Sequence, residues 1–399
     1  MKVINGSIAS PLGFQAQGVA CGIKKNGGRD LALVVSDVPA ACAAVFTRNL
    51  VKGHSLQRSM DHVSGGLARA VIVNSGNANA CVGPQGDLDA MAMAMETARL
   101  IGCPTTQILL NSTGVIGHPL PMDRLLKGIE NAVRLLERTD AAGHAAEEAI
   151  MTTDTMPKEV SVVFQRDGRD VTVSGMAKGS GMIHPDMATM IGLITTDCAV
   201  DARILYETLF EAVSTTFNRV SVDGDTSVCD MVAVLANGMA GNVTVTDRDP
   251  ELSEAFHLVC ETLARMVARD GEGATKLVEV IVHGARTAED AYRIVQAVAK
   301  SPLVKTAMFG EDANWGRILT AAGYSGAAFD PSRCDIFIGD LQVCSGGAAL
   351  AFDETCAKEI LASDNIAIRL EMNEGESWDR VWTCDFSYDY VRINGSYRT

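Results

Sequence analysis

The sequence of 399 residues has no apolar run near the roughly 18 uncharged residues that a membrane-spanning helix needs, although 47% of it is hydrophobic. The apolar surplus instead predicts buried strands and helices. Basic residues are also scarce, because 34 Lys and Arg stand against 49 Asp and Glu, a net charge of −15. Since nucleic-acid binding needs a basic surface, this balance argues against a nucleic-acid partner. An anionic substrate must therefore meet a local lysine or arginine.

Metal-ligand patterns are absent as well. The eleven cysteines include no CxxC pair and no Cys/His cluster at zinc spacing, so we interpret them as reduced core residues and predict no metal and no cofactor. Asp223-Gly224-Asp225 has only Asp230 as a nearby further ligand, which favours a solvated loop. The segment Met1 to Gly6 has one lysine and no long apolar region, so we expect no secretory signal and a cytoplasmic protein.

Helices and strands mix throughout the chain, which predicts an α/β (α+β) fold. Apolar periodicity predicts helices over 87–101, with Met91, Met95, Ala98 and Ile101 on its core face, and over 125–136, 141–150, 202–217, 250–269, 288–300 and 353–361. Two pairs of joined strands are predicted: 31–35 and 43–46, joined by a turn at Pro39, and 160–164 and 171–173, joined by an Asp167-Gly168 turn. The other predicted strands are 69–73, 107–110, 190–195, 277–282, 366–370, 379–385 and 388–393. Residues from about 285 to 399 are expected to form a smaller C-terminal α+β domain.

A glycine-punctuated loop from Lys178 to Met190 is the most informative stretch. Thr189 follows a small alanine there, and its hydroxyl could attack the Ala188 carbonyl, shift the acyl group from nitrogen to oxygen and cut the chain. Hydrolysis would free the α-amine of Thr189, whose usual pKa of about 7.7–8.0 suits a base for the same hydroxyl. A threonine that opens a buried strand is a common structural feature, so for this loop alone the structural interpretation is the stronger of the two.

A second motif, Thr113-Gly114, follows the predicted strand at 107–110. A hydroxyl and a glycine N–H at a strand end can donate two hydrogen bonds to a tetrahedral oxyanion. On its own, an ordinary turn is the better explanation of this pair, because short Thr-Gly pairs are frequent. The catalytic interpretation is stronger when the two motifs are considered together.

Six segments together resemble the ornithine acetyltransferase (glutamate N-acetyltransferase) family of arginine biosynthesis. The likeness spans nearly the whole chain, and the stretch from Lys178 to Met190 is its most specific part. In chain order the segments are Asn74-Ser75-Gly76-Asn77-Ala78-Asn79-Ala80, Asn111-Ser112-Thr113-Gly114-Val115-Ile116-Gly117, Thr152-Thr153-Asp154, Lys178-Gly179-Ser180-Gly181-Met182-Ile183-His184-Pro185-Asp186-Met187-Ala188-Thr189-Met190, Gly271-Glu272-Gly273-Ala274-Thr275-Lys276 and Asn394-Gly395-Ser396-Tyr397-Arg398-Thr399.

The resemblance implies an autoprocessed enzyme with an α chain of residues 1–188 and a β chain of residues 189–399, assembled as an α2β2 heterotetramer. Such an enzyme moves an acetyl group from N-acetylornithine to glutamate through an acetyl-Thr189 intermediate, with Thr113 and Gly114 as the oxyanion hole. The implied fold is a layered αββα-type sandwich with an N-terminal-nucleophile threonine. The implied substrate-binding residues are Thr152, Lys178, Thr189, Glu272, Asn394 and Thr399.

The chemistry of these residues agrees with those roles. In an acidic protein Lys178 is a plausible clamp for a substrate carboxylate, and Glu272 could receive the ornithine ammonium, although a structural Lys–Glu pair is an alternative for both. Two other functions stay open: a related aminopeptidase or amidase that uses water as acceptor, and an uncleaved binding protein. Whether acetyl-CoA serves as a second acetyl donor is not decided by any motif.

Overall fold

The computed structural model describes residues 1–184 and 190–396. Ala188, Thr189 and Thr399, which carry the predicted cleavage, nucleophile and terminal binding roles, lie outside the described residues. Among the described residues, the chain divides into two compact units, the first made of residues 1–184, 190–218 and 226–263 and the second of residues 219–225 and 264–396. The second unit thus includes the stretch from about 285 that the sequence predicts as a C-terminal domain, together with residues before it.

The first unit is built on a nine-stranded sheet in the order β1-β6-β7-β8-β10-β3-β4-β5, with β2 paired to β3. Its strands are β1 (Lys2–Ile4), β2 (Phe14–Val19), β3 (Leu31–Phe46), β4 (Leu67–Asn77), β5 (Ile108–Val115), β6 (Glu159–Arg166), β7 (Arg169–Lys178), β8 (Ile191–Thr196) and β10 (Met231–Ala236). Its helices are α1 (His54–Val63), α2 (Gln85–Ile101), η1 (Thr105–Gln107), α3 (Met122–Arg134), α4 (Asp140–Ile150), α5 (Ala202–Thr215), η2 (Phe217–Arg219) and α6 (Pro250–Arg269), whose last residues belong to the second unit.

The long strand β3 joins two halves of this sheet. Its first half pairs with β2 and β4, whereas residues 41–46 pair with β10. The prediction of two strands joined by a turn at Pro39 is therefore wrong. Pro39 is exposed and lies where the pairing of β3 with β4 shifts register, a position that a residue without an N–H donor tolerates.

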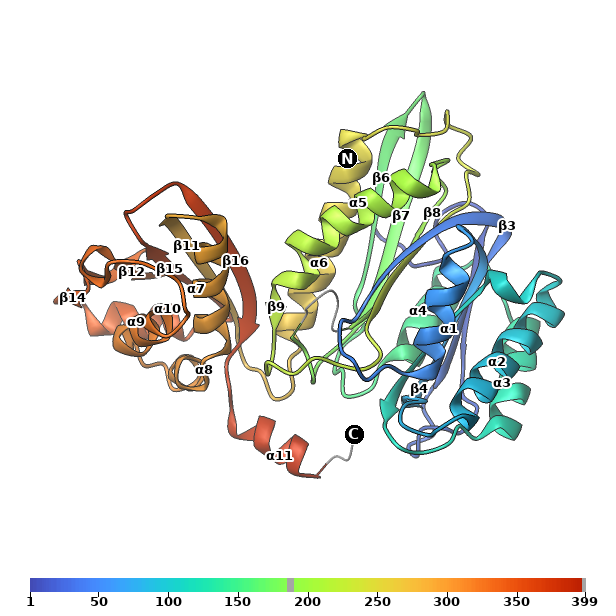
Figure 1. Cartoon of the computed structure of the whole chain (residues 1–399), viewed down its shortest axis with the longest axis horizontal. Helices are drawn as coiled ribbons and strands as arrows, with labels where there is room; N and C mark the ends of the chain where they lie inside the picture. Colours follow the sequence, from blue (N-terminus) through green and yellow to red (C-terminus); the bar gives the residue numbers. More distant parts are fainter. Residues whose placement is uncertain (185–189, 397–399) are drawn as a thin grey trace. The chain divides into compact units, whose positions relative to one another are not determined.

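Helices and sheet halves alternate in layers, so the predicted α/β sandwich is confirmed. A Cβ on Gly175 of β7 would meet Val259 and Leu263 of α6, which places α6 against the outer face of that half. Helices α2 and α3 pack on the outer face of β3, β4 and β5, on the far side of the unit from α5 and α6 (Figure 1). Between the halves, Leu56 of α1 and Ile150 of α4 share one core cluster with β3, β7 and β8.

A predicted hairpin turn and a predicted helix cap in this unit are confirmed, whereas the predicted core face of one helix is an exception. The hairpin β6–β7 turns at Asp167 and Gly168, both with positive φ, and the Asp201 side chain caps α5. The exception is the core face of α2, where Met93 and Ala94 are buried while Met95 is exposed. An alternating Ala-Met sequence is apolar on every side, so periodicity could not select the face.

The second unit contains a seven-stranded sheet in the order β14-β13-β12-β15-β11-β16-β9. Helices α7, α8 and α9 contribute Val295, Met308 and Ile318 to a core shared with β11 and β12. The elements are β9 (Val220–Ser221), β11 (Leu277–Ala285), α7 (Ala288–Lys300), α8 (Pro302–Phe309), α9 (Trp315–Gly323), η3 (Pro331–Arg333), β12 (Asp335–Ile338), β13 (Leu341–Ser345), β14 (Ala348–Ala349), α10 (Glu354–Leu361), β15 (Asn365–Glu371), β16 (Ser377–Cys384) and α11 (Tyr388–Ser396).

The prediction of a last strand at 388–393 is wrong, because these residues belong to helix α11. Tyr, Val and Ile favour strands only where a sheet edge is at hand. The preceding strand β16 already pairs with β11 on one side and with β9 on the other. Both edges of β16 are therefore occupied, and residues 388–393 cannot pair with it as the next strand of a hairpin.

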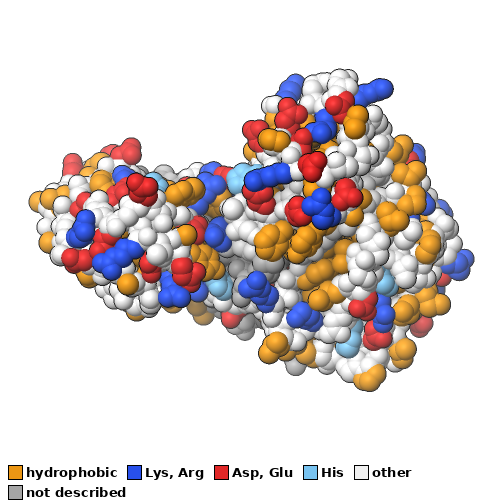
Figure 2. All heavy atoms as spheres, turned by 45° about the horizontal axis from the view of Figure 1, so that its top comes forward, with side chains coloured by type: hydrophobic (Ala, Val, Ile, Leu, Met, Phe, Trp, Pro, Cys, Tyr) orange, Lys and Arg blue, Asp and Glu red, His pale blue; other side chains and the backbone are white. Residues whose placement is uncertain are grey.

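The distribution of surface charge and the state of the cysteines can be compared with what the composition predicts. On the face shown in Figure 2, basic and acidic side chains are intermixed. All the cysteines are free thiols, and most are buried. Within the residues that the structure describes, no helix combines the length and apolar character needed to cross a membrane.

Candidate functional site at the ends of β4, β5 and β7

The polar ends of β4 and β5 lie side by side in the first unit. The two strands are parallel, and Ser75 pairs with Thr113 while Gly76 pairs with Gly114. A register shift at Gly76 and Asn77 ends the regular ladder. The strand β5 thus continues through Thr113 and Gly114, beyond the predicted end at 110, and carries both at its carboxyl end.

Buried hydroxyls and amides fix this strand end. The Ser112 hydroxyl donates to Asn74 Oδ1 at 2.6 Å and lies 2.7 Å from the Ser55 hydroxyl, which in turn accepts from Asn79 Nδ2 at 3.2 Å. Asn111 Nδ2 donates to the Cys229 carbonyl at 2.8 Å. Because each group is buried and hydrogen-bonded, the network holds the backbone at Thr113 in one arrangement.

Gly114 occupies a position that admits no side chain. Its φ is +128°, and a Cβ there would lie 2.4 Å from the Gly76 carbonyl carbon and 2.7 Å from the Asn77 nitrogen. Close packing of two backbones and a rarely allowed φ both require glycine. This geometry sets the direction of the Gly114 N–H group.

Lys178, the last residue of β7, reaches Thr113. Its Nζ lies 3.5 Å from Thr113 Oγ1, a long hydrogen bond, and the residue is 7% exposed. An ammonium group only donates, so Thr113 Oγ1 accepts this bond and its own proton points elsewhere. Thr113 therefore has a hydroxyl proton available for a further acceptor next to the Gly114 N–H.

The buried carboxylate of Asp154 ties two predicted binding segments together. It accepts from Lys158 Nζ at 2.8 Å, from the Gly179 nitrogen at 2.6 Å and from the Thr152 nitrogen at 2.9 Å. Burial alone would raise the pKa of this carboxyl, but the charges of Lys178 and Lys158 outweigh it and hold that pKa well below its usual range. Asp154 is thus a permanent negative charge facing Lys178.

Two neighbouring carboxyls behave in the opposite way. Burial, together with the charge of Asp154, raises the pKa of Glu147 on α4 to about 9, although the Lys158 nitrogen donates to its Oε1 at 2.9 Å. Burial also raises the pKa of Asp230, just before β10, well above its usual range, against the opposing effects of Ser227 and Lys178. The raised pKa values favour the neutral form of both groups, so Asp154 keeps its negative charge to a lower pH than either of them.

The second unit brings two further predicted residues together. Glu272 is buried in a loop after α6, and its Oε2 accepts from Asn394 Nδ2 of α11 at 2.7 Å. Gly273 beside it has a φ of +71°, and a Cβ there would lie 2.6 Å from the Tyr390 nitrogen, so the loop and α11 are in close contact. The hydrogen-bond partner of Glu272 is an amide, which differs from the Lys–Glu pair considered from the sequence.

The structure therefore groups Thr113, Gly114, Lys178 and Thr152 in the first unit, and Glu272 and Asn394 in the second. Their catalytic and binding roles stay predictions. Sequence reasoning gave no role to Asp154, Lys158 or Glu147. The four-residue spacing of Asp154 and Lys158 was the available signal, but a salt bridge at that spacing usually belongs to an exposed helix.

Comparison with known proteins gives a consistent picture. The family model described as the ArgJ family matches residues 15–399. A protein of Symbiobacterium thermophilum, named arginine biosynthesis bifunctional protein ArgJ, is 49% identical over 404 residues and covers 100% of both chains. A protein of the same name from Caldanaerobacter subterraneus subsp. tengcongensis is 48% identical over 406 residues, again over 100% of both chains.

A solved structure is also similar. The crystal structure of arginine biosynthesis bifunctional protein argJ from Bacillus halodurans is 43% identical, with a TM-score of 0.50. The match covers 51% of this chain but 98% of that chain. The solved chain thus corresponds over almost its whole length to about half of the present one.

Proposed function

Because this chain belongs to the ArgJ family of arginine biosynthesis, we propose that it transfers an acetyl group from N-acetylornithine to glutamate. The full-length match to relatives named arginine biosynthesis bifunctional protein ArgJ supports this choice. The observation that carries the chemistry is the contact of Lys178 with Thr113 beside the constrained Gly114. In this arrangement a cation suited to a substrate carboxylate lies next to two hydrogen-bond donors suited to an oxyanion.

In the proposed reaction Thr189 is the nucleophile. Its hydroxyl attacks the acetyl carbonyl, its α-amine takes the proton, and the Thr113 hydroxyl and Gly114 N–H stabilise the oxyanion. The C–N bond breaks, the proton passes to the ornithine amine, and acetyl-Thr189 remains. The neutral amine of glutamate then attacks this ester, the proton returns to Thr189, and N-acetylglutamate leaves.

Substrate recognition follows from the charges. Both substrates carry a carboxylate, for which Lys178 is the proposed partner, with Thr152 beside it. Glu272 and Asn394 are proposed to receive the side-chain ammonium of ornithine, and Thr399 completes the predicted set. Asp154 keeps Lys178 and the Thr152 backbone in place through its three hydrogen bonds and its charge.

We also propose that the chain cuts itself between Ala188 and Thr189 and assembles as an α2β2 heterotetramer in the cytoplasm. Autocleavage would give an α chain of residues 1–188 and a β chain of residues 189–399. The Bacillus halodurans chain, which corresponds to 51% of this one, has the length expected of one product of such a cut. Thr189→Ala should abolish both cleavage and turnover, whereas Thr189→Ser should keep some of each.

The transfer itself is tested by dependence on the acceptor. Purified protein should release ornithine from N-acetylornithine rapidly when glutamate is present and slowly when it is absent. Equal release without glutamate would instead support an amidase that uses water. Lys178→Met should raise the KM for glutamate, while Lys127→Met on the exposed side of α3 serves as a matched control.

The relatives are named as bifunctional proteins, and we propose acetyl-CoA as a second acetyl donor for glutamate. Incubation of the protein with glutamate and acetyl-CoA, without N-acetylornithine, tests this activity. Formation of N-acetylglutamate is the expected result. A protein that transfers from N-acetylornithine but leaves acetyl-CoA unused would contradict the second activity alone.

A further inference from the structure

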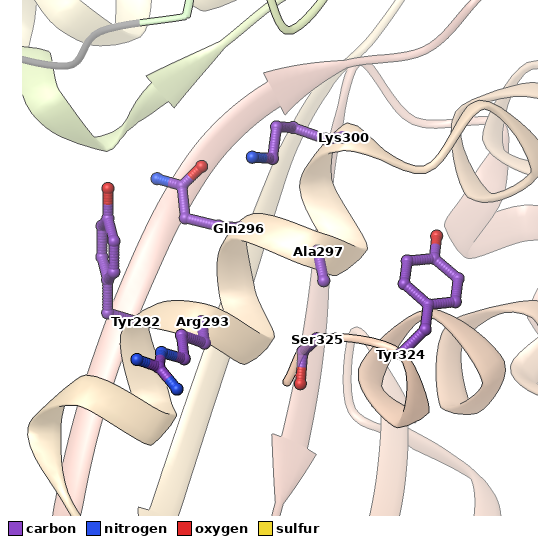
Figure 3. A pocket seen from close by; sticks show the side chains of 7 residues that line it. All are labelled: Tyr292, Arg293, Gln296, Ala297, Lys300, Tyr324 and Ser325. Atoms are coloured by element: carbon purple, nitrogen blue, oxygen red, sulfur yellow. The ribbon is translucent and has the colours of Figure 1, made fainter. Parts of the chain in front are cut away.

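A pocket of about 430 Å³ lies on helix α7 in the second unit. Tyr292, Gln296 and Lys300 line it at intervals of four residues, so they form one stripe along the helix. Figure 3 shows these three side chains pointing to the same side of α7. None of them belongs to the proposed transfer site.

Gln296 is the unusual member of this stripe. It is 5% exposed, yet neither Nε2 nor Oε1 has a hydrogen-bond partner among the described residues. Leaving a buried amide unpaired is destabilising, and such groups in native proteins call for an explanation. An amide both donates and accepts, so a molecule that satisfies Gln296 must carry a donor and an acceptor close together.

Lys300 supplies a positive charge at the end of the same stripe. Within the described parts of the chain Lys300 forms no ion pair, although a Cβ on Gly224 of the Asp223-Gly224-Asp225 loop would lie 3.9 Å from its Cδ, and burial lowers its pKa. The nearby Arg293 is different, because its Nε donates to Glu289 Oε1 at 2.8 Å. Lys300 is therefore the cation that a bound anion would meet.

The remaining wall is apolar or aromatic. Ala297 of α7 and Tyr324, which follows α9, line the pocket together with the ring of Tyr292. No carboxylate is among the residues that line it. Such a wall suits an uncharged side chain, and the volume lies within the roughly 300–1,000 Å³ of small-molecule sites.

We propose that this pocket binds a free α-amino acid with an uncharged side chain. The α-carboxylate pairs with Lys300 and accepts from Gln296 Nε2, while the α-ammonium donates to Gln296 Oε1. The side chain of the amino acid packs against the ring of Tyr292, next to Gln296 on α7. Both ends of the buried amide are then satisfied by one zwitterion.

Equilibrium dialysis of the full protein against L-phenylalanine tests the proposal. We expect saturable binding of one molecule per copy of the sequence. Two matched compounds remove one charge each, since 3-phenylpropanoate lacks the ammonium and phenethylamine lacks the carboxylate. Each should bind at least about tenfold more weakly, because one end of Gln296 or the charge of Lys300 is then left unpaired.

Variants locate the binding. Gln296→Leu and Lys300→Met should each weaken phenylalanine binding by about tenfold or more. Lys358→Met on the exposed surface of α10 and Lys178→Met in the proposed transfer site should leave it unchanged. Gln296→Leu should unfold at a temperature no lower than the parent protein, because it removes an unpaired amide, so lost binding cannot be attributed to unfolding.

Three outcomes would overturn the proposal. The first is the absence of saturable binding of phenylalanine, and the second is binding that survives both Gln296→Leu and Lys300→Met. The third is equal affinity for 3-phenylpropanoate, which would make the pocket a simple anion site.

Discussion

The residues proposed to act on substrate lie in two contrasting structural environments. In the first unit, Thr113 and Lys178 end strands whose neighbouring hydroxyls, amides and carboxylate are buried and hydrogen-bonded. In the second unit, Asn394 lies on α11, a helix in which none of the residues Tyr388–Ser396 is buried. Groups that must meet a developing charge benefit from fixed geometry, whereas groups that recognise a substrate end can adjust. Mutations should therefore affect the two regions differently.

The largest effect is expected for Gly114→Ala. The new Cβ would collide with the Gly76 and Asn77 backbone, move the Gly114 N–H and destabilise the strand end. Loss of one oxyanion donor lowers turnover by about 10²–10³ fold. Gly117→Ala is the matched control, because its φ is +82° but nothing lies within 4 Å of the added Cβ. Steady-state assays of both variants decide the matter, and equal turnover in the two would contradict the role of Gly114.

Asp154→Asn should come next, with a loss of about 3–5 kcal/mol in unfolding free energy at pH 7, because it leaves two buried lysines without their shared carboxylate. In the parent protein the folded-state pKa of Asp154 is depressed, so its contribution is present above the unfolded value of about 3.9 and is lost as pH falls. The unfolding free energy of the variant should not show this decrease as the pH falls. Urea unfolding from pH 3 to pH 8 measures both effects, and a variant as stable as the parent at pH 7 would refute the pairing.

Glu147→Gln should change stability in the opposite direction. Since the folded-state pKa of Glu147 is raised to about 9, the unfolded chain releases its proton first and stability falls as pH rises from about 4.5 to 9. Glutamine keeps the acceptor for the Lys158 nitrogen but does not titrate. The variant should therefore be more stable at pH 8 by on the order of 2 kcal/mol and should lose this slope. A parent protein and variant with the same pH dependence of unfolding would show that Glu147 is ionised when folded.

The smallest effect is expected for Asn394→Ala. Removal of one hydrogen bond to Glu272 should raise the KM for N-acetylornithine about fivefold, a change of about 1 kcal/mol, and leave the unfolding temperature unchanged. Arg392→Ala on the same helix removes an exposed ion pair and should alter neither quantity. A collapse of kcat in Asn394→Ala would mean that α11 is as closely involved in the chemistry as Thr113.

The sequence predicted what depends on local pattern. The helices 250–269 and 288–300, the Asp167-Gly168 hairpin and the strand after Met190 follow from periodicity and turn chemistry. The unbroken strand β3 and the helix at 388–396 were missed, because each depends on which strand lies beside it. Long-range pairing of this kind leaves no mark in the local composition.

The candidate site divides in the same way. The segments that contain Thr113, Lys178 and Glu272 could be predicted from their residues and from the family resemblance. The buried groups that hold these residues in position could not. Asp154 keeps its charge because Lys178 and Lys158 outweigh its burial, whereas burial keeps Glu147 protonated. Such environments exist only in the folded protein.

Intact-mass analysis of the purified, denatured protein tests the central proposal most directly. It should show two polypeptides, residues 1–188 and 189–399, and the second should gain one acetyl group with N-acetylornithine and lose it when glutamate is added. A single species of 42.2 kDa, or a β chain whose acetyl group persists in the presence of glutamate, would contradict the account.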